Sequence, residues 1–309
     1  MHKIILDTDP GIDDALAILL LATSSEIELK AITVTHGNTT VDKCLANAIQ
    51  IADLAGIRNI PIAKGANQPL IGKLQIAEET HGDTGLGYAK LPPSNYPIHS
   101  NNASQLIVEL VKKYPGEITI LGIGPVTNIA LALISNPEIK PLIKDVVLMA
   151  GSFEYAGNAS PVAEYNVFCD PYALQVLINA NLDLTIIPLD VTYQCLFTKE
   201  HLAELQNCKK DIYEFISDST RFYMEFHQEY QNITGCAIND PLVVAYLLNR
   251  ELLELMECYV EVNLHKGNFY GKTSADRFST LGLAPNAKVA TQVDVPAFMK
   301  LFIDRMHKL

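Results

Sequence analysis

The sequence lacks an excess of basic residues, long hydrophobic runs and paired cysteines, and each absence excludes a class of protein. With 23 Lys and Arg against 35 Asp and Glu, the formal charge is −12, which argues against a nucleic acid or an anionic membrane as partner. Apolar runs such as residues 15–22 are far too short to span a bilayer. The first expected strand begins at residue 3 and leaves no room for a signal peptide, so we expect a soluble, cytoplasmic protein.

The six cysteines are scattered, with no Cys-x-x-Cys pair. This distribution favours reduced, mostly buried thiols over a disulfide framework or a zinc site. No linker, internal repeat or low-complexity segment interrupts the chain, and 49% of the residues are hydrophobic, enough for a large core. We therefore expect residues 1–309 to form a single domain, although the chain is longer than most domains.

Apolar runs typical of strands alternate along the chain with segments of helical period. Strands are expected at residues 29–35, 60–63, 117–123, 146–150, 184–189, 259–264 and 287–293. Helices are expected at residues 41–55, 103–114, 126–134, 171–180 and 211–230. This alternation predicts an α/β fold: an open, mainly parallel, doubly wound sheet with helices on both faces, extended by C-terminal helices and edge strands.

Four aspartates surround a turn near the start of the chain. A short apolar run ends in Asp7 and Asp9, Pro10-Gly11 turns the backbone, and Asp13 and Asp14 open a helical pattern. Helix capping accounts for one or two of these carboxylates. Four so close together repel one another unless a cation lies between them, and all-oxygen ligands select a hard ion such as Ca²⁺ or Mg²⁺. The cluster therefore predicts a metal site, with plain capping as the alternative.

Polar segments also follow other expected strands, at His36-Gly37-Asn38, at residues 124–128 and at Gly151-Ser152. Ligands of doubly wound sheets bind beyond the carboxyl ends of the strands, so these segments and the aspartates predict one shared pocket. Each segment is alternatively only a turn, since Gly, Asn and Pro are turn residues. Two long stretches without a regular pattern, residues 65–101 and 151–169, are of the kind that is usually functional.

Motifs of other enzyme classes fail. Gly271-Lys272-Thr273 lacks the earlier glycine of a P-loop, and no nucleophile elbow, zinc-protease pair or dinucleotide fingerprint is present. Asp7-Thr8-Asp9 suggests a metal-dependent phosphatase with an aspartyl-phosphate, but Gly11 stands where that chemistry expects Thr or Val. The phosphatase is therefore a disfavoured alternative.

The run Asp-Thr-Asp-Pro-Gly-Ile-Asp-Asp-Ala at residues 7–15 resembles the signature of the inosine–uridine-preferring nucleoside hydrolases. Further segments match site segments of that family in order, and together they cover essentially the whole chain: Gly37-Asn38, His81-Gly82, residues 124–128, residues 158–166 and Asn239-Asp240-Pro241. The resemblance implies an open α/β sheet, a tightly held Ca²⁺ and hydrolysis of the N-glycosidic bond of ribonucleosides to free base and ribose in nucleoside salvage. It also implies a homodimer or homotetramer.

Carried over residue by residue, the resemblance implies a calcium held by Asp9, Asp14, Asp240 and the backbone carbonyl of Thr127. Asp9 is also the expected general base toward a water on the calcium, and Asp7 is expected to orient the other residues. The ribose hydroxyls are expected to be held by Asp13, Asn38, Asn158, Glu164 and Asn166. These roles suit an oxocarbenium-like transition state, which needs a positioned water, stabilised sugar charge and help for the departing base.

Asn239 departs from the family pattern, because purine-competent members commonly carry there a His that protonates the leaving base. An Asn side chain donates a hydrogen bond but transfers no proton near neutral pH, so the base preference is open. A ribose- or nucleoside-binding protein with weak turnover is therefore an alternative to the enzyme.

Tyr223 and His227 lie four residues apart in a helical pattern and share one face, and the resemblance places them beside the base. We predict that His227 is the replacement acid, with an exposed helix histidine as the alternative, and that Tyr223 covers the base unless it is core. His81 is expected in the pocket, because its Gly-rich loop resembles the mobile flap of the family. Tyr165 and Phe153 are expected as an apolar wall, or alternatively as core.

Overall fold

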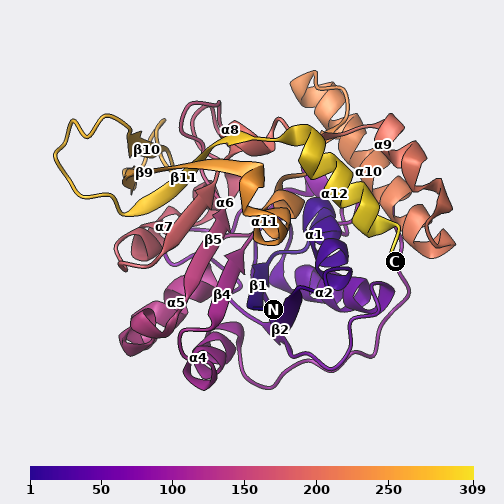
Figure 1. Cartoon of the computed structure of the whole chain (residues 1–309), viewed down its shortest axis with the longest axis horizontal. Helices are drawn as coiled ribbons and strands as arrows, with labels where there is room; N and C mark the ends of the chain where they lie inside the picture. Colours follow the sequence, from indigo (N-terminus) through magenta and orange to yellow (C-terminus); the bar gives the residue numbers. More distant parts are fainter.

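A nine-stranded sheet with helices on both faces forms the frame of the protein (Figure 1). The computed structural model describes all 309 residues. In spatial order the strands are β10 (Thr273–Asp276), β9 (Leu253–Val262), β11 (Ala287–Val293), β6 (Leu184–Ile187), β5 (Asp145–Met149), β4 (Ile118–Gly122), β1 (His2–Thr8), β2 (Ile27–Val34) and β3 (Ile62–Lys64). All neighbours from β11 to β3 are parallel, and β9 and β10 are antiparallel additions at one edge.

Two hydrophobic cores lie on opposite faces of this sheet, with 54 and 33 buried residues. The larger core contains apolar side chains of α1, α2, α10, α11 and α12, and the smaller contains those of α4, α5 and α7. The helices are α1 (Ile12–Ala22), α2 (Val41–Leu54), α3 (Glu78–His81), α4 (Ala103–Lys113), α5 (Thr127–Ser135), α6 (Tyr165–Cys169), α7 (Pro171–Ile178), α8 (Leu189–Thr192), α9 (Lys199–Glu204), α10 (Lys210–Gln231), α11 (Asn239–Leu248) and α12 (Val295–Met306). No helix combines the length and the apolar content needed to cross a bilayer.

The central strand β1 determines where the site lies. Its residues Ile4, Ile5 and Leu6 are fully buried, as expected for a parallel strand covered on both faces. β1 pairs with β2 on one side and with β4 on the other. The chain therefore proceeds outward from β1 to β3 and later returns to build β4, β5 and β6 in the opposite direction. Such a reversal separates the loops that follow the two central strands and opens a crevice at their carboxyl ends.

The predicted α/β fold with a mainly parallel sheet is confirmed, and most element bounds agree within two residues. The strand expected at residues 259–264 begins earlier, at Leu253, because Glu254 and Glu257 interrupt the alternation in its first half. Strand β10 and the separate two-stranded antiparallel sheet of β7 (Leu196–Phe197) and β8 (Cys236–Ala237) are not predicted by the sequence, since two to four residues carry too little pattern. For the same reason, the stretches expected to lack regular structure contain the single-turn helices α3 and α6.

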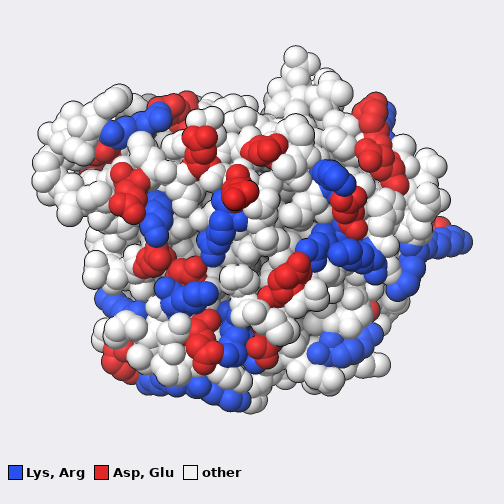
Figure 2. Space-filling model, viewed as in Figure 1, with Lys and Arg blue, Asp and Glu red and all other residues white.

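Acidic and basic side chains are interspersed on the face of the molecule shown in Figure 2, and neither kind forms an extended patch there. Many are paired, as are Lys288 and Asp183 at 2.7 Å and Lys300 and Asp304 at 2.6 Å. Such exposed pairs contribute little to stability. The unbalanced negative charge that bears on function lies inside the protein, at the crevice beside β1.

Candidate active site

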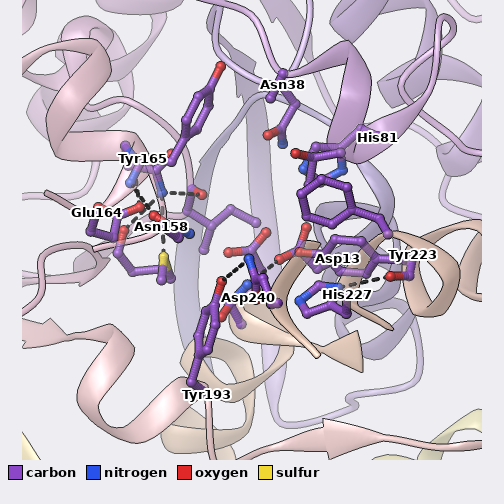
Figure 3. A pocket seen from close by; sticks show the side chains of 18 residues that line it. Asp13, Asn38, His81, Asn158, Glu164, Tyr165, Tyr193, Tyr223, His227 and Asp240 are labelled. Atoms are coloured by element: carbon purple, nitrogen blue, oxygen red, sulfur yellow. Dashed lines mark hydrogen bonds between the residues drawn. The ribbon is translucent and has the colours of Figure 1, made fainter. Parts of the chain in front are cut away.

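A cleft opens at the carboxyl ends of the central strands (Figure 3). It has about 550 Å³ of empty space, counting the part open to solvent. None of the lining residues is Lys or Arg. They are Asp13, Asn38, Ala77, Thr80, His81, Ile123, Met149, Asn158, Glu164, Tyr165, Asn166, Tyr193, Tyr223, Phe226, His227, Gln231, Asn239 and Asp240.

Three buried carboxylates converge at the floor of the cleft. Oxygens of Asp13, Asp14 and Asp240 lie within 4.8 Å of one another. Burial and the neighbouring Asp13 raise the pKa of Asp14 to about 6. The pKa of Asp240 is raised further, first by burial and then by the charges of Asp13, Asp14 and Asp9. These three carboxylates and the carboxylate of Asp9 thus form one electrostatic group, in which full ionisation is disfavoured in the absence of a cation.

The turn after β1 holds Asp14 in place. Its carboxylate accepts hydrogen bonds from the Thr8 hydroxyl, from the Gly11 N–H at 3.0 Å and from the Asn38 side-chain amide at 2.8 Å. The bond to Gly11 closes the first turn of α1, so the capping expected for part of the aspartate cluster is present. Capping uses one carboxylate and leaves the convergence of the others unexplained.

Asp9 lies directly behind this group, enclosed by two glycines. One carboxylate oxygen, Oδ2, accepts the Asn38 N–H at 2.6 Å, and the other, Oδ1, is buried without a partner. A Cβ atom at Gly37 or Gly124 would lie 2.0 or 2.3 Å from an Asp9 oxygen, so only glycine allows both loops to close over Asp9. The unpartnered oxygen is costly unless a further group binds it.

Asp7 and Thr127 lie farther from the cleft and do not line it. The Asp7 carboxylate accepts hydrogen bonds from the Thr33 hydroxyl at 2.6 Å and the Asn128 side chain at 2.8 Å, and burial raises its pKa to about 7. The Thr127 hydroxyl donates to Asp170 at 2.7 Å at the start of α5. The position of Asp7 suits a residue that supports the cluster from behind, and the hydrogen bond of the Thr127 hydroxyl leaves the Thr127 backbone carbonyl free of that contact.

The donor set fits a hard cation. It consists of carboxylate oxygens only, one of them is an orphaned buried atom, and no basic side chain lines the cleft to offset the charge. The closest-packed group contains Asp13 where the resemblance implied Asp9, so the structure brings Asp14 and Asp240 together as expected and adds Asp13 to them.

One wall of the cleft carries the residues expected at the sugar. The Glu164 carboxylate caps α6 by accepting the Asn166 and Val167 N–H groups at 2.7 and 3.1 Å, and it also accepts the Gly151 N–H at 2.9 Å. Burial raises its pKa to about 7. The Asn166 amide donates to the carbonyls of Ile123 and Met149, at 3.1 Å each, so its oxygen is the atom left for a ligand.

Asn158 and Tyr165 complete this wall. The Asn158 side-chain oxygen accepts the Tyr165 N–H at 2.8 Å, which leaves the amide nitrogen of Asn158 for the cleft. The Tyr165 hydroxyl donates across the cleft to the Gly37 carbonyl at 2.8 Å. Tyr165 therefore joins the two sides of the site instead of belonging to the core. Phe153 does not line the cleft. It packs against the smaller core, which is the alternative to an apolar wall that the sequence left open.

The opposite wall contains His227, whose two ring nitrogens are both engaged by the backbone. Nδ1 donates to the Tyr223 carbonyl at 2.8 Å, and Nε2 accepts the Ala237 N–H at 3.4 Å. A carbonyl only accepts and an N–H only donates, so this geometry requires the neutral Nδ1–H tautomer. Burial lowers the pKa of His227 to about 4. The ring lines the cleft as expected but has no proton to offer there, and it is buried where the alternative assignment had it exposed.

His81 has the opposite arrangement. Its Nδ1 accepts the Ile12 N–H at 3.1 Å, so the proton of the neutral ring lies on Nε2. Burial lowers its pKa to about 4, and its ring lies 5.3 Å from that of Tyr223. Of the two histidines in the cleft, His81 is therefore the one with an N–H group available to a ligand.

Asn239 is tied to Asp13. Its side-chain amide donates to the Asp13 carboxylate at 2.9 Å, and its oxygen is buried without a partner. Because an ionised carboxylate only accepts, the Asn239 oxygen must face away from Asp13. The residue thus presents an acceptor at a position where the family commonly has a proton donor.

Several lining residues escaped the sequence analysis. Gln231 follows Tyr223 and His227 at helical spacing, so the i, i+4, i+8 pattern on α10 was a usable signal. Tyr193 had no such signal, because it follows the single-turn helix α8. Its hydroxyl accepts a hydrogen bond from the Gln231 amide at 3.3 Å.

Comparison with known families agrees with this architecture. The family model described as inosine-uridine preferring nucleoside hydrolase matches residues 4–300. The chain belongs to this family. The nucleoside hydrolase is 35% identical over 300 residues to a pyrimidine-specific ribonucleoside hydrolase, RihB, of Escherichia coli O157:H7, with 97% of this chain and 95% of the relative covered. It is accordingly a ribonucleoside hydrolase, an enzyme that cleaves N-glycosidic bonds.

Solved structures of other nucleoside hydrolases superimpose closely on this one. A purine-preferring ribonucleoside hydrolase from Gardnerella vaginalis is 33% identical, with a TM-score of 0.93 and coverage of 99% of this chain and 98% of the other. The plant nucleoside hydrolase PpNRh1 is 29% identical, with a TM-score of 0.95 and coverage of 100% and 99%. RihB is named pyrimidine-specific and the Gardnerella enzyme purine-preferring, so likeness alone does not assign the base to this nucleoside hydrolase.

Proposed function

We propose that this ribonucleoside hydrolase holds one Ca²⁺ in its buried carboxylate cluster and uses it to hydrolyse ribonucleosides to free base and ribose, in nucleoside salvage. The main support for this proposal is that the carboxylates of Asp13, Asp14 and Asp240 converge, with Asp9 behind them, in a cleft that no Lys or Arg side chain lines. Buried charges of one sign need a partner, and this chain supplies none at the cluster.

We assign Asp9, Asp14, Asp240 and the Thr127 carbonyl to the cation. The unpartnered Oδ1 atom supports Asp9, and the close approach of the carboxylates supports Asp14 and Asp240. Thr127 rests on the resemblance alone. When bound, Ca²⁺ supplies positive charge that offsets these carboxylates and favours loss of a proton from the attacking water.

Asp9 is the proposed general base. It accepts a proton from water at Oδ1 while the water oxygen bonds to C1′ and the C1′–N bond breaks, the electron pair leaving with the base. Asp13, Asn38, Asn158, Glu164 and Asn166 are the proposed contacts to the ribose hydroxyls. Their carboxylate and amide oxygens stabilise the sugar as positive charge develops on it.

On the base side, we assign the hydrogen bond to the leaving group to His81 and revise the prediction for His227. His81 has its ring proton on Nε2, whereas both nitrogens of His227 are bound to backbone groups. With a pKa lowered to about 4, His81 is neutral near pH 7 and donates a hydrogen bond without being a strong acid. Asn239 keeps Asp13 oriented, and His227 and Tyr223 shape the wall.

Two hydrogen-bond acceptors in the cleft bear on which nucleobase the enzyme prefers. The side-chain oxygens of Asn239 and Gln231 are both buried without a hydrogen-bond partner. Buried acceptors are normally satisfied, so we infer that the base presents N–H donors toward the α10–α11 wall. Uracil, hypoxanthine and the amino-substituted bases all carry such donors.

A panel of the common ribonucleosides and their 2′-deoxy analogues tests the function, with free base and ribose as readouts. We expect release from ribonucleosides and a loss of about 10²-fold or more for the 2′-deoxy compounds, because they leave polar ribose-binding groups unpaired. Binding of ribonucleosides without release of base would support the alternative of a nucleoside-binding protein with weak turnover.

We also infer a homodimer or homotetramer from the family resemblance, which sedimentation of the purified protein tests. All six cysteines are free and five of them are buried, which supports a reducing, cytoplasmic location. The nine-stranded sheet draws strands from both ends of the chain, which supports a single domain.

A further inference from the structure

The loop that follows β5 is held at its middle by one carboxylate. Asp190, in the short helix α8, accepts three consecutive backbone N–H groups: those of Phe153 at 2.9 Å, Glu154 at 2.7 Å and Tyr155 at 3.3 Å. Three successive amides around one anion form a concave nest, a specific and directional arrangement.

Asp190 is the only side chain that accepts the N–H groups of residues 153–155, and the other attachments of this part of the loop are few. Glu154 and Tyr155 are exposed, so burial of apolar surface contributes little there. The start of the loop is anchored by the Ser152 N–H, which donates to the Thr273 hydroxyl at 3.0 Å. The Ser152 hydroxyl donates to the carbonyls of Tyr155 at 2.5 Å and Ala156 at 3.2 Å, and Glu154 forms an exposed ion pair with Arg277.

The same loop delivers Asn158 to the sugar wall of the cleft. Asn158 is itself exposed, and its side-chain oxygen is held by the Tyr165 N–H at 2.8 Å. From α8, Asp190 contacts the loop just before this point, and Tyr193, three residues later, lines the cleft and lies 5.2 Å from the Tyr155 ring. The short helix α8 and the residue that follows it thus hold the loop that carries Asn158 and form part of the cleft wall.

We propose that Asp190 is a positioning residue of the hydrolase: its carboxylate fixes the loop over residues 153–155 and thereby places Asn158 for ribose binding, while Asp190 itself touches no substrate. Asp190 is absent from the cleft lining and instead borders a separate surface hollow with Arg277 and Thr291. The inference rests on the proposed role of Asn158 at the sugar.

A double-mutant cycle with Asp190→Asn and Asn158→Ala tests the proposal, with KM and kcat measured on a ribonucleoside that the parent cleaves. The Asn side chain has nearly the same size, but it places an amide group against backbone donors. We expect Asp190→Asn to raise KM by roughly 10-fold with a smaller change in kcat, since a misplacement of about 1 Å costs up to about 10²-fold. In the Asn158→Ala background the same change should leave KM within about 2-fold.

Arg277→Ala is the matched control, because it removes the ion pair on the same loop without touching the three amide hydrogen bonds; we expect an unchanged KM. Asp190→Ser, which keeps an oxygen acceptor, runs through the same cycle in parallel. If the increases in KM of the two single variants multiply in the double variant, Asp190 acts independently of Asn158 and the proposal is overturned. A failure of both Asp190 variants to fold would also overturn it. If Asn158→Ala raises KM and Asp190→Asn does not, only the positioning role fails. If Asn158→Ala changes nothing, the sugar-binding assignment fails first.

Discussion

Asp240→Asn should change the stability of this protein in opposite directions with and without calcium. Asp240 lies in the first turn of α11, and its carboxylate is within 4.8 Å of those of Asp13 and Asp14. The groups that act most strongly on its pKa, burial first and then its acidic neighbours, all raise it. The amide replacement removes one charge from this group at almost constant volume.

The magnitude follows from the spacing. Two unit charges 4.8 Å apart repel by about 3.5 kcal/mol at an effective dielectric constant of about 20. If Asp240 takes up a proton instead, the pKa raised by burial and by its acidic neighbours means that its ionised form is disfavoured in the folded protein, and the amide avoids this cost as well. Loss of a favourable charge at the helix N-terminus offsets roughly 0.3–1 kcal/mol of either gain. Without metal, Asp240→Asn should therefore stabilise the protein by about 3 kcal/mol.

In calcium the sign reverses. A chain of 309 residues has an unfolding entropy near 0.65 kcal/mol/K, so about 3 kcal/mol corresponds to a Tm rise of about 5 °C in chelator. Calcium at 1,000 times its Kd stabilises the parent by about 4.1 kcal/mol, more than the about 3 kcal/mol gained by the substitution. The variant, lacking a ligand, should gain much less and should therefore be the less stable protein in calcium. Differential scanning calorimetry of both proteins, with chelator and with calcium, measures the effect.

Asp183→Asn is the control for this experiment, because it breaks only the exposed pair with Lys288 and should shift Tm equally in both conditions. A Tm that falls by the same amount with chelator and with calcium in Asp240→Asn would refute the reasoning. Asp240 would then be an ordinary structural residue, and the repulsion assigned to the cluster would not exist.

Other consequences can be measured on activity and on calcium binding. Asp9→Asn should lower kcat by about 10³-fold or more, because it removes the general base and weakens a cation ligand together; turnover within tenfold of the parent would exclude that role. The rise in Tm caused by calcium should shrink as the pH is lowered from 7.5 to 5.5. The cation binds the ionised form of Asp14, and because the pKa of Asp14 is raised to about 6, protons compete with the cation as the pH falls through that value. A rise in Tm that stays constant over this pH range would contradict the assignment. His81→Ala should lower inosine or uridine turnover by about 10²-fold, the loss typical of one removed hydrogen-bond donor to a developing charge, and should spare 4-nitrophenyl riboside, whose leaving group needs little assistance. His227→Ala should affect both substrates equally. A loss in His227→Ala confined to the nucleosides would restore His227 as the acid.

The alternation of apolar runs and helical periods was sufficient to predict the sheet and the edge at which the site lies, because both signals are local in the sequence. The aspartates after β1 were equally readable, since their spacing is a property of one turn. The composition of the closest carboxylate group was not, because it depends on the angle at which α1 leaves the turn and brings Asp13 toward Asp240 in α11.

The state of His227 shows why side-chain roles could not be predicted. Helical spacing with Tyr223 correctly predicted a place on the cleft wall. The hydrogen bond from Ala237, in a two-residue strand with no sequence signal, occupies the second ring nitrogen. A backbone N–H group from another element thus determines which ring nitrogen of His227 carries the proton. The support of the loop at residues 153–155 by Asp190 is hidden for the same reason, since the N–H groups of a loop carry no residue identity.

The proposed function requires that the buried carboxylates hold a cation. Its most direct test is a calcium titration of the chelator-stripped protein, in which bound metal and the release of base from a cleaved ribonucleoside are measured in the same samples. We expect no turnover before addition, and recovery of activity in proportion to occupancy up to one calcium per chain. Full turnover in stripped protein with no detectable divalent metal would contradict it.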